Sequence, residues 1–85
     1  MKFTAYTDSG HGWVKVKKDL LTKLGIQHKI SRYSYMRGDY AYLEEDCDVE
    51  HLYQALLSQG KELVTKVQYS YKRSKIRSYS SYASW

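Results

Sequence analysis

The feature that most constrains this chain is the stretch from Ser31 to Glu44, where tyrosine recurs at alternate positions on both sides of Arg37-Gly38-Asp39. Alternation with a period of two is typical of β-strands, because successive side chains point to opposite faces. Glycine adopts the positive φ that a tight turn requires. The stretch therefore predicts a β-hairpin, around which the other segments can be placed.

The register of this hairpin decides where its aromatic rings lie. With a two-residue turn at residues 37–38, Tyr35 lies opposite Tyr40. Tyr33 then lies opposite Tyr42, and all four rings share one face. The other face carries the smaller or aliphatic side chains of Ser34, Met36, Ala41 and Leu43. A three-residue turn would shift the pairing by one residue and scatter the rings over both faces.

Apolar periodicity predicts two helices. Residues 49–57 carry one apolar stripe at positions i, i+3, i+4, i+7 and i+8. Asp46 or Asp48 is the expected N-cap of this helix, and Gly60 follows its last turn. A shorter helix, with three leucines on one side, is predicted over residues 17–24.

The predicted strands complete an α+β order. Residues 2–7 and 63–71 read as strands, and residues 13–16 as a short strand or the lead-in to the first helix. The resulting order, β(β)αββαβ, predicts a two-layer sandwich in which two helices cover one side of an antiparallel sheet. We expect one α+β domain over residues 1–71 and a basic Ser/Tyr-rich C-terminal arm over residues 72–85. The arm is either mobile or laid over the domain, with anchors at Ile76, Tyr79, Tyr82 and Trp85.

Composition limits the class of protein and its compartment. The chain has ten tyrosines and one phenylalanine. Because a tyrosine side chain combines an apolar ring with a polar hydroxyl group, this composition indicates aromatic side chains that are partly exposed at the surface. No apolar run approaches the roughly 20 residues that span a bilayer, and the N-terminus lacks the layout of a signal peptide. A single cysteine, Cys47, excludes an intramolecular disulfide. We therefore expect a cytoplasmic protein.

Charge is distributed unevenly along the chain. Residues 1–38 hold eight Lys/Arg against two Asp, residues 39–60 hold six acids and no Lys or Arg, and residues 61–85 hold six Lys/Arg against one Glu. The net charge of +5 favours polyanionic or acidic partners. Mutual neutralisation of the acidic and basic parts within the fold is the equally weighted alternative.

The four rings and the acids that follow them form the candidate partner-binding surface. Tyr and Arg are enriched at interface hot spots. The residues predicted to contact a protein partner are Tyr33, Tyr35, Arg37, Tyr40, Tyr42, Glu44, Glu45 and Asp46. Two plainer readings stay open: the rings can belong to the core, and the acids can complement the N-terminal end of the following helix.

Binding of single-stranded nucleic acid is the alternative use of the same region. The rings would stack on bases, and the cations would contact phosphates. The residues predicted for this role, in addition to the ring face, are Arg32, Lys72, Arg73, Lys75, Arg77, Tyr79 and Tyr82.

Catalytic and metal-binding signals are weaker. His11 lies between two glycines, which suits an anion or proton-transfer site but is also common in flexible loops. Cys47 does not combine with His28 or His51 at a zinc spacing, and the acids lack the Asp-x-Asp-x-Asp-Gly pattern of calcium loops. The sequence therefore predicts no metal, no cofactor and no enzymatic activity, with His11 or Cys47 chemistry as a distant alternative.

Several motifs resemble one known family. They are Gly-His-Gly-Trp-Val-Lys-Val at 10–16, Leu-Leu-x-x-Leu-Gly-Ile at 20–26, Lys-Ile-Ser-x-Tyr-Ser-Tyr-x-Arg-Gly-Asp at 29–39, Tyr-Leu-Glu-Glu-Asp-Cys-Asp at 42–48, and Arg-Ser-x-Ile-Arg-x-Tyr-x-Ser-Tyr at 73–82. Together they resemble a family of small proteins carried by bacteriophages and conjugative plasmids. The resemblance implies an accessory protein of a mobile element and brings no catalytic residue with it.

These observations together predict a non-enzymatic binding protein. The leading hypothesis is a stoichiometric inhibitor of a bacterial defence protein or ribonucleoprotein complex, such as CRISPR–Cas, in the bacterial host cell. The alternative is a single-stranded nucleic-acid-binding module that uses the tyrosine face and the basic arm. The unpaired edge of a small sheet is a further candidate contact, for a homodimer.

Overall fold

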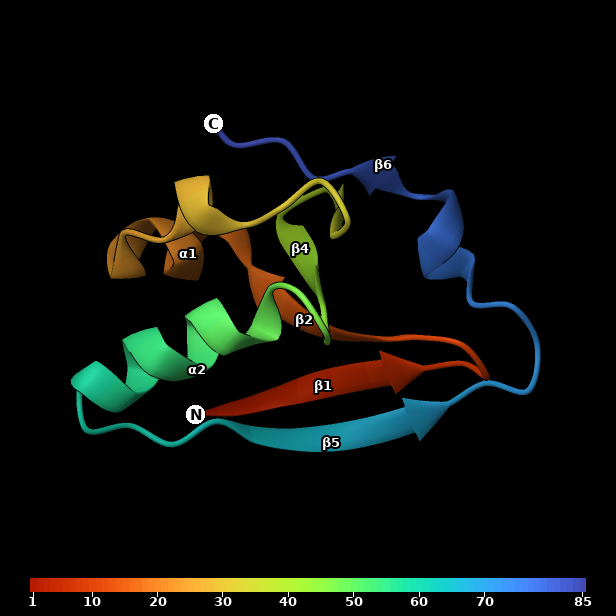
Figure 1. The fold of residues 1–85 in the computed structure, drawn as a ribbon, viewed down its shortest axis with the longest axis horizontal. Helices are drawn as coiled ribbons and strands as arrows, with labels where there is room; N and C mark the ends of the chain where they lie inside the picture. The colour runs from red at the N-terminus through yellow and green to blue at the C-terminus, as the bar shows by residue number, and fades with distance from the viewer.

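The computed structural model describes residues 1–85 and shows one mixed sheet with two α-helices (Figure 1). The elements in chain order are β1 (Lys2–Thr7), β2 (Gly12–Lys17), α1 (Lys18–Leu24), the 3-10 helix η1 (Gln27–Lys29), β3 (Tyr35–Arg37), β4 (Tyr40–Glu44), α2 (Val49–Ser58), β5 (Val64–Tyr69), the 3-10 helix η2 (Lys75–Ser78) and β6 (Ser80–Ser81). The predicted α+β class is confirmed.

The sheet has six strands in the order β5-β1-β2-β4-β3-β6. All neighbouring pairs are antiparallel except β1 and β5, which run parallel. The prediction of a wholly antiparallel sheet is therefore wrong at this edge. The physical reason is that α2, which follows β4 in the chain, forms a crossover connection. It brings the chain back across the sheet, so that β5 begins beside the start of β1 and runs in the same direction. β5 is exposed along its whole length.

The hairpin forms, but its turn consists of Gly38 and Asp39. Arg37 pairs with Tyr40 and Tyr35 with Tyr42, so the predicted pairs of Tyr35 with Tyr40 and Tyr33 with Tyr42 are wrong. Gly38 has φ 58°, and glycine at the first central position is the preference of type II′ hairpins. The register differs from the predicted one by two residues, and an even shift leaves each strand residue on its predicted face.

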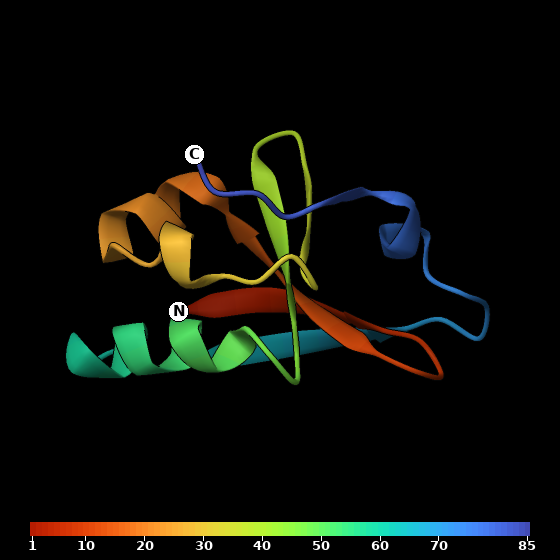
Figure 2. The ribbon, with the colours of Figure 1, turned by 45° about the horizontal axis from the view of Figure 1, so that its top comes forward.

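The two faces of the sheet are covered differently, and Figure 2 shows both helices on one side. On this helical face, α1 and α2 bury the main core against β1, β2 and β4. Its fully buried members include Val16, Leu21, Leu43, Leu52 and Leu56. The apolar stripe predicted for residues 49–57 thus forms α2, whose buried residues are Leu52 and Leu56.

The C-terminal arm lies over the other face, here called the open face. Ile76 of η2 is buried there with Trp13 and Tyr42 in a second, smaller core. β6 then pairs with β3, and Tyr82 enters the main core on the helical side. The arm therefore runs around the β3 edge of the sheet and ends beside α1, where Trp85 Nε1 donates to Thr22 Oγ1 at 2.8 Å (Figure 2).

Asp48 precedes α2 and makes no side-chain cap hydrogen bond, which corrects its predicted role. Its buried carboxylate accepts instead from Ser31 N at 2.9 Å, from Ser31 Oγ at 2.7 Å and from Ser34 Oγ. Ser34 Oγ in turn accepts from Glu44 N at 2.8 Å. These bonds hold the loop before β3 against the start of α2, so Tyr33 lies in a turn rather than in the strand.

Candidate functional site

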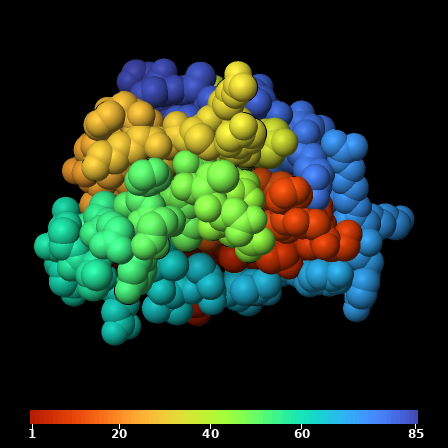
Figure 3. Space-filling view, viewed as in Figure 1, coloured from red at the N-terminus to blue at the C-terminus, as the bar shows by residue number.

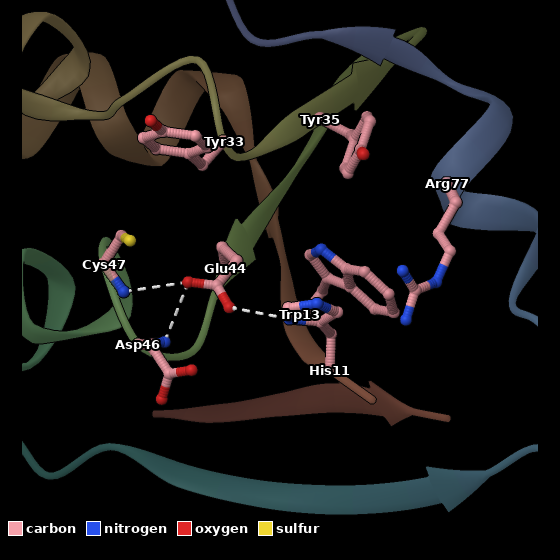
Figure 4. Close-up of a pocket in the computed structure, with 8 residues that line it drawn as sticks. All are labelled: His11, Trp13, Tyr33, Tyr35, Glu44, Asp46, Cys47 and Arg77. Atoms are coloured by element: carbon pink, nitrogen blue, oxygen red, sulfur yellow. Dashed lines mark hydrogen bonds and ion pairs between the residues drawn. The ribbon is translucent and has the colours of Figure 1, made fainter. Parts of the chain in front are cut away.

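Three segments that are distant in sequence meet at one corner of the molecule. In Figure 3 the loop between β1 and β2, the turn after β4 and the loop before β3 lie side by side. Between them and η2 lies a pocket of about 290 Å³. The residues that line this corner pocket are His11, Trp13, Tyr33, Tyr35, Glu44, Asp46, Cys47 and Arg77 (Figure 4).

The pairing of β2 with β4 brings His11 close to the acids. Trp13 lies opposite Glu44 in the register, and Glu45 N donates to Gly12 O at 2.9 Å. A Cβ at Gly12 would lie 2.5 Å from Glu45 Oε2, so glycine permits this close approach. The β1–β2 loop is therefore held directly against the turn that follows β4.

Glu44 is the buried carboxylate of the corner pocket, with 6% of its surface exposed. One oxygen, Oε2, accepts from the backbone N–H groups of Asp46 and Cys47, both at 2.9 Å. The other, Oε1, lies 3.5 Å from His11 Nδ1. Figure 4 shows the carboxylate between the turn and the histidine, so it has one oxygen committed to the backbone and one directed toward His11.

The same carboxylate affects Cys47. A hydrogen bond to Glu44, followed by desolvation and by the surrounding acids, raises the pKa of the Cys47 thiol. A raised pKa keeps the sulfur protonated near neutral pH, and the thiol is a much weaker nucleophile than the thiolate. The Glu44 carboxylate thus opposes formation of the nucleophilic thiolate at Cys47.

Trp13 forms the floor of the corner pocket and is only 2% exposed. The Arg77 guanidinium lies over its ring at 5.4 Å from the centroid, and Tyr35 meets it edge-on at 6.3 Å. Its indole Nε1 is buried and has no hydrogen-bond partner. In Figure 4 this nitrogen is turned toward the space between Glu44 and Tyr35.

Asp8 fixes the arm that closes one side of the pocket. Its carboxylate receives Arg77 Nε at 2.8 Å and Nη2 at 2.9 Å, together with the backbone N–H of Ser74 at 3.0 Å. The N–H groups of Gly10 and His11 also donate to it, each at 3.0 Å. The Arg77 hydrogen bonds and then the backbone donors hold the pKa of Asp8 well below its usual range.

The predicted tyrosine platform is not a free surface. Tyr42 is 8% exposed beneath the arm, and its ring lies 5.1 Å from that of Tyr79. Tyr35 is half-buried against Trp13, whereas Tyr33 is 63% exposed. The four rings do share the open face or its margin, but the chain's own C-terminal arm occupies the space in which bases were expected to stack.

A second hollow, the basic groove, lies on the open face on the other side of η2. It has a volume of about 550 Å³, and its lining includes Tyr6, Lys15, Arg37, Tyr40, Tyr42, Gln68, Lys75 and Tyr79. Lys15 Nζ lies 4.1 Å from the centroid of the Tyr40 ring, and the Arg37 guanidinium lies 5.1 Å from that of Tyr79. The adjoining hollow shares Lys15 and Tyr40 and adds Lys2 and Lys17.

Only some of the residues predicted for nucleic-acid binding lie at the basic groove. Lys75 and Tyr79 line the basic groove, and Lys72 and Arg73 are exposed on the chain that leads into it. Arg77 is instead paired with Asp8, and Tyr82 is buried with its O–H donated to Gln27 O at 2.6 Å. Arg77 and Tyr82 thus make contacts within the domain, and their role in strand binding stays a prediction. Arg32 is exposed in the loop before β3.

Of the predicted protein-binding residues, the corner pocket gathers Tyr33, Tyr35, Glu44 and Asp46, whereas Arg37 and Tyr40 line the basic groove. Glu45 is exposed beside Gly12. Sequence reasoning missed Trp13, and it did not connect His11 with Glu44. The alternation of Trp13 with Lys15 in a strand was the available signal, but only the pairing of β2 with β4 joins the two groups.

Comparisons with protein-family models, with curated proteins and with solved structures found no match for this chain. Neither α1 nor α2 has the length and apolar character that crossing a membrane requires.

Proposed function

We propose that this chain is a small non-enzymatic binding protein whose basic groove holds single-stranded nucleic acid. The observation that carries the proposal is the concentration of cations and rings on the open face. Lys15, Arg37 and Lys75 surround Tyr40 and Tyr79, and Asp39 is the one acid in the lining. A hollow whose lining carries three cations against one acid concentrates ligands of negative charge.

The arrangement suits a flexible strand better than a rigid duplex. Arg37 and Lys75 are exposed at this groove, and the Tyr40 and Tyr79 side chains in its lining are half-buried. Lys2 and Lys17 extend the positive charge along the same face, beyond Tyr40. The cations would contact successive phosphates, and bases would contact only the parts of the tyrosine rings that the arm and the cations leave open.

Salt dependence of binding tests this proposal. Fluorescence anisotropy with a labelled oligo(dT) and an oligo(U) strand should show binding at about 50 mM salt that weakens steeply by about 200 mM, because bound counterions are released. Lys15→Ala and Lys75→Ala should each weaken binding and reduce the salt slope by about 1. Lys23→Ala, an exposed lysine in the last turn of α1, is the matched control and should leave binding unchanged. Absence of binding at the lower salt concentration would overturn the proposal.

Inhibition of a bacterial defence complex is the second candidate function, favoured by the corner pocket. Tyr33 is exposed beside Asp46 and Cys47, and Glu45 and Glu50 add negative charge nearby along the chain. An exposed ring with adjoining carboxylates complements the basic surface on which a defence nuclease holds its own nucleic acid. The resemblance to small proteins of phages and plasmids points the same way.

A reconstituted CRISPR–Cas or restriction cleavage reaction separates the two candidates. Stoichiometric inhibition that is lost in Tyr33→Ala and retained in Lys15→Ala supports the defence-inhibitor function. Inhibition that requires Lys15 and disappears when excess unrelated single strand is added would instead reflect binding of the substrate. Circular dichroism of each variant confirms that the domain remains folded.

A further inference from the structure

The corner pocket also contains a group of side chains that carry metal-ligating atoms. His11 Nδ1, a Glu44 carboxylate oxygen and an Asp46 carboxylate oxygen all lie within 4.8 Å of one another. We propose that these three side chains bind a divalent transition-metal ion of the Zn²⁺ class. This inference is independent of strand binding in the basic groove.

The distance between His11 and Glu44 supports a shared ion. The 3.5 Å between Nδ1 and Oε1 is longer than an N–H···O hydrogen bond, for which about 2.7–3.2 Å is usual. Two ligand atoms that each lie about 2.1 Å from a tetrahedral Zn²⁺ ion are about 3.4 Å apart. The pair thus has the separation of two ligands on one metal ion.

The Glu44 carboxylate and the His11 backbone are also held in place before any ion binds. The Asp46 and Cys47 N–H groups fix Oε2 of Glu44 and leave Oε1 directed toward His11. The His11 backbone N–H is fixed by Asp8. Asp46 is exposed, and one of its carboxylate oxygens already lies within 4.8 Å of the other two ligand atoms. A site whose ligands are positioned by surrounding hydrogen bonds loses little entropy on binding an ion.

Trp13 supplies an independent indication of a ligand in this pocket. Its buried indole N–H has no acceptor, and burying a donor without a partner costs about 1–3 kcal/mol. The nitrogen faces the pocket interior (Figure 4). Three protein ligands leave an open position on a tetrahedral ion, and an oxygen ligand there, from water or a partner's carboxylate, is the kind of acceptor that this N–H lacks.

The donor set selects the class of ion. One imidazole nitrogen with two carboxylates suits Zn²⁺ and related transition metals, whereas Mg²⁺ and Ca²⁺ prefer oxygen ligands alone. The Arg77 cation that lies near the pocket is paired with Asp8, which reduces its repulsion of a second cation. Cys47 adjoins the site but does not belong to the group of three side chains whose ligand atoms lie within 4.8 Å of one another.

Isothermal titration of the untagged chain with Zn²⁺, and absorption spectra with Co²⁺, test the site. We expect one ion per chain and visible d–d bands with Co²⁺. His11→Ala and Asp46→Asn should each weaken affinity by at least about 100-fold, since loss of even an outer hydrogen-bond partner costs 10- to 100-fold. Glu44→Gln should weaken it as well while keeping an oxygen that can accept from the Asp46 and Cys47 N–H groups.

His28→Ala is the matched control, because His28 is exposed and belongs to η1, outside the pocket. It should bind Zn²⁺ as the unaltered chain does. The proposal is overturned if no ion binds, if His11→Ala binds as tightly as the unaltered chain, or if Ca²⁺ or Mg²⁺ binds in preference to Zn²⁺. Urea unfolding of each variant without metal distinguishes loss of a ligand from loss of the fold.

Discussion

The helical face of the sheet buries aliphatic side chains, whereas the open face buries aromatic ones beneath the C-terminal arm. On the helical face, Leu52 and Leu56 of α2 are fully buried against the strands. On the open face, Trp13, Tyr42 and Ile76 form a cluster of only three buried residues. One face is therefore covered by two helices and the other by a single short segment.

This difference explains where the candidate sites lie. The helices cover their face broadly, but η2 is too short to cover the open face in the same way. Arg77 borders the corner pocket, while Lys75 and Tyr79 border the basic groove. The two hollows thus flank the covering segment.

Paired truncations in the two cores should give the largest effects. Leu52→Ala should lower the free energy of unfolding by about 2–5 kcal/mol, because it leaves a cavity among fully buried neighbours. Ile76→Ala should cost about 2 kcal/mol, near the lower end, because its small cluster can relax. Urea unfolding followed by circular dichroism measures both values, with exposed Leu57→Ala as a control that changes stability by less than about 0.5 kcal/mol. An equal cost at both positions would contradict the distinction between the two faces.

Asp8→Asn should release the arm from the open face without unfolding the helical face. The pKa of Asp8 is depressed by Arg77 and the backbone donors, so its contribution to stability is present above its usual pKa and is lost as pH falls below it. At neutral pH the Asn variant should therefore exchange the Gly10, His11 and Ser74 amide hydrogens faster than the unaltered chain. Hydrogen exchange with mass spectrometry measures this, and Asp19→Asn, an exposed acid in α1, is the control. Unchanged exchange at these amides would show that the arm is held by other contacts.

Tyr82→Phe should have the smallest effect of the three and a different pH dependence. It removes the hydrogen bond to Gln27 O and should cost about 1 kcal/mol at neutral pH. Burial, with a smaller contribution from Asp48, raises the pKa of Tyr82 to about 12. The pKa of Tyr82 in the folded chain lies above its value of about 10 in the unfolded chain. The free energy that the neutral Tyr82 side chain contributes to folding is therefore fully present below pH 10 and disappears as pH rises through 12. Unfolding measured at pH 8, 10 and 11 should show the two proteins converging, and parallel curves would contradict the assignment.

The local periodicities predicted the elements well. The stripe over residues 49–57 became α2, Gly38 formed the turn of the hairpin, and Tyr35, Tyr40 and Tyr42 share a face as expected. The individual pairs were wrong because the pattern alone does not distinguish a turn at 37–38 from one at 38–39. The two registers differ by two residues, and a shift of two leaves side-chain orientation unchanged.

Contacts between distant residues could not be predicted in the same way. Asp48 was expected to cap α2, and instead it binds Ser31 and Ser34. Arg77 was expected to contact phosphates, and instead it pairs with Asp8, 69 positions earlier in the chain. A buried carboxylate forms charge-assisted hydrogen bonds with whichever donors the fold brings near it, and sequence spacing does not specify those donors.

The sequence by itself determined the α+β class, the apolar stripe of the helical core, and which side chains of the hairpin share a face of the sheet. These features depend on side-chain periodicity along a few neighbouring residues. Only the tertiary structure decided that the C-terminal arm covers the open face and that His11, Trp13 and Glu44 share one pocket. Those outcomes depend on strand pairing and on contacts across most of the chain, whose free energies are set by packing in three dimensions rather than by local pattern.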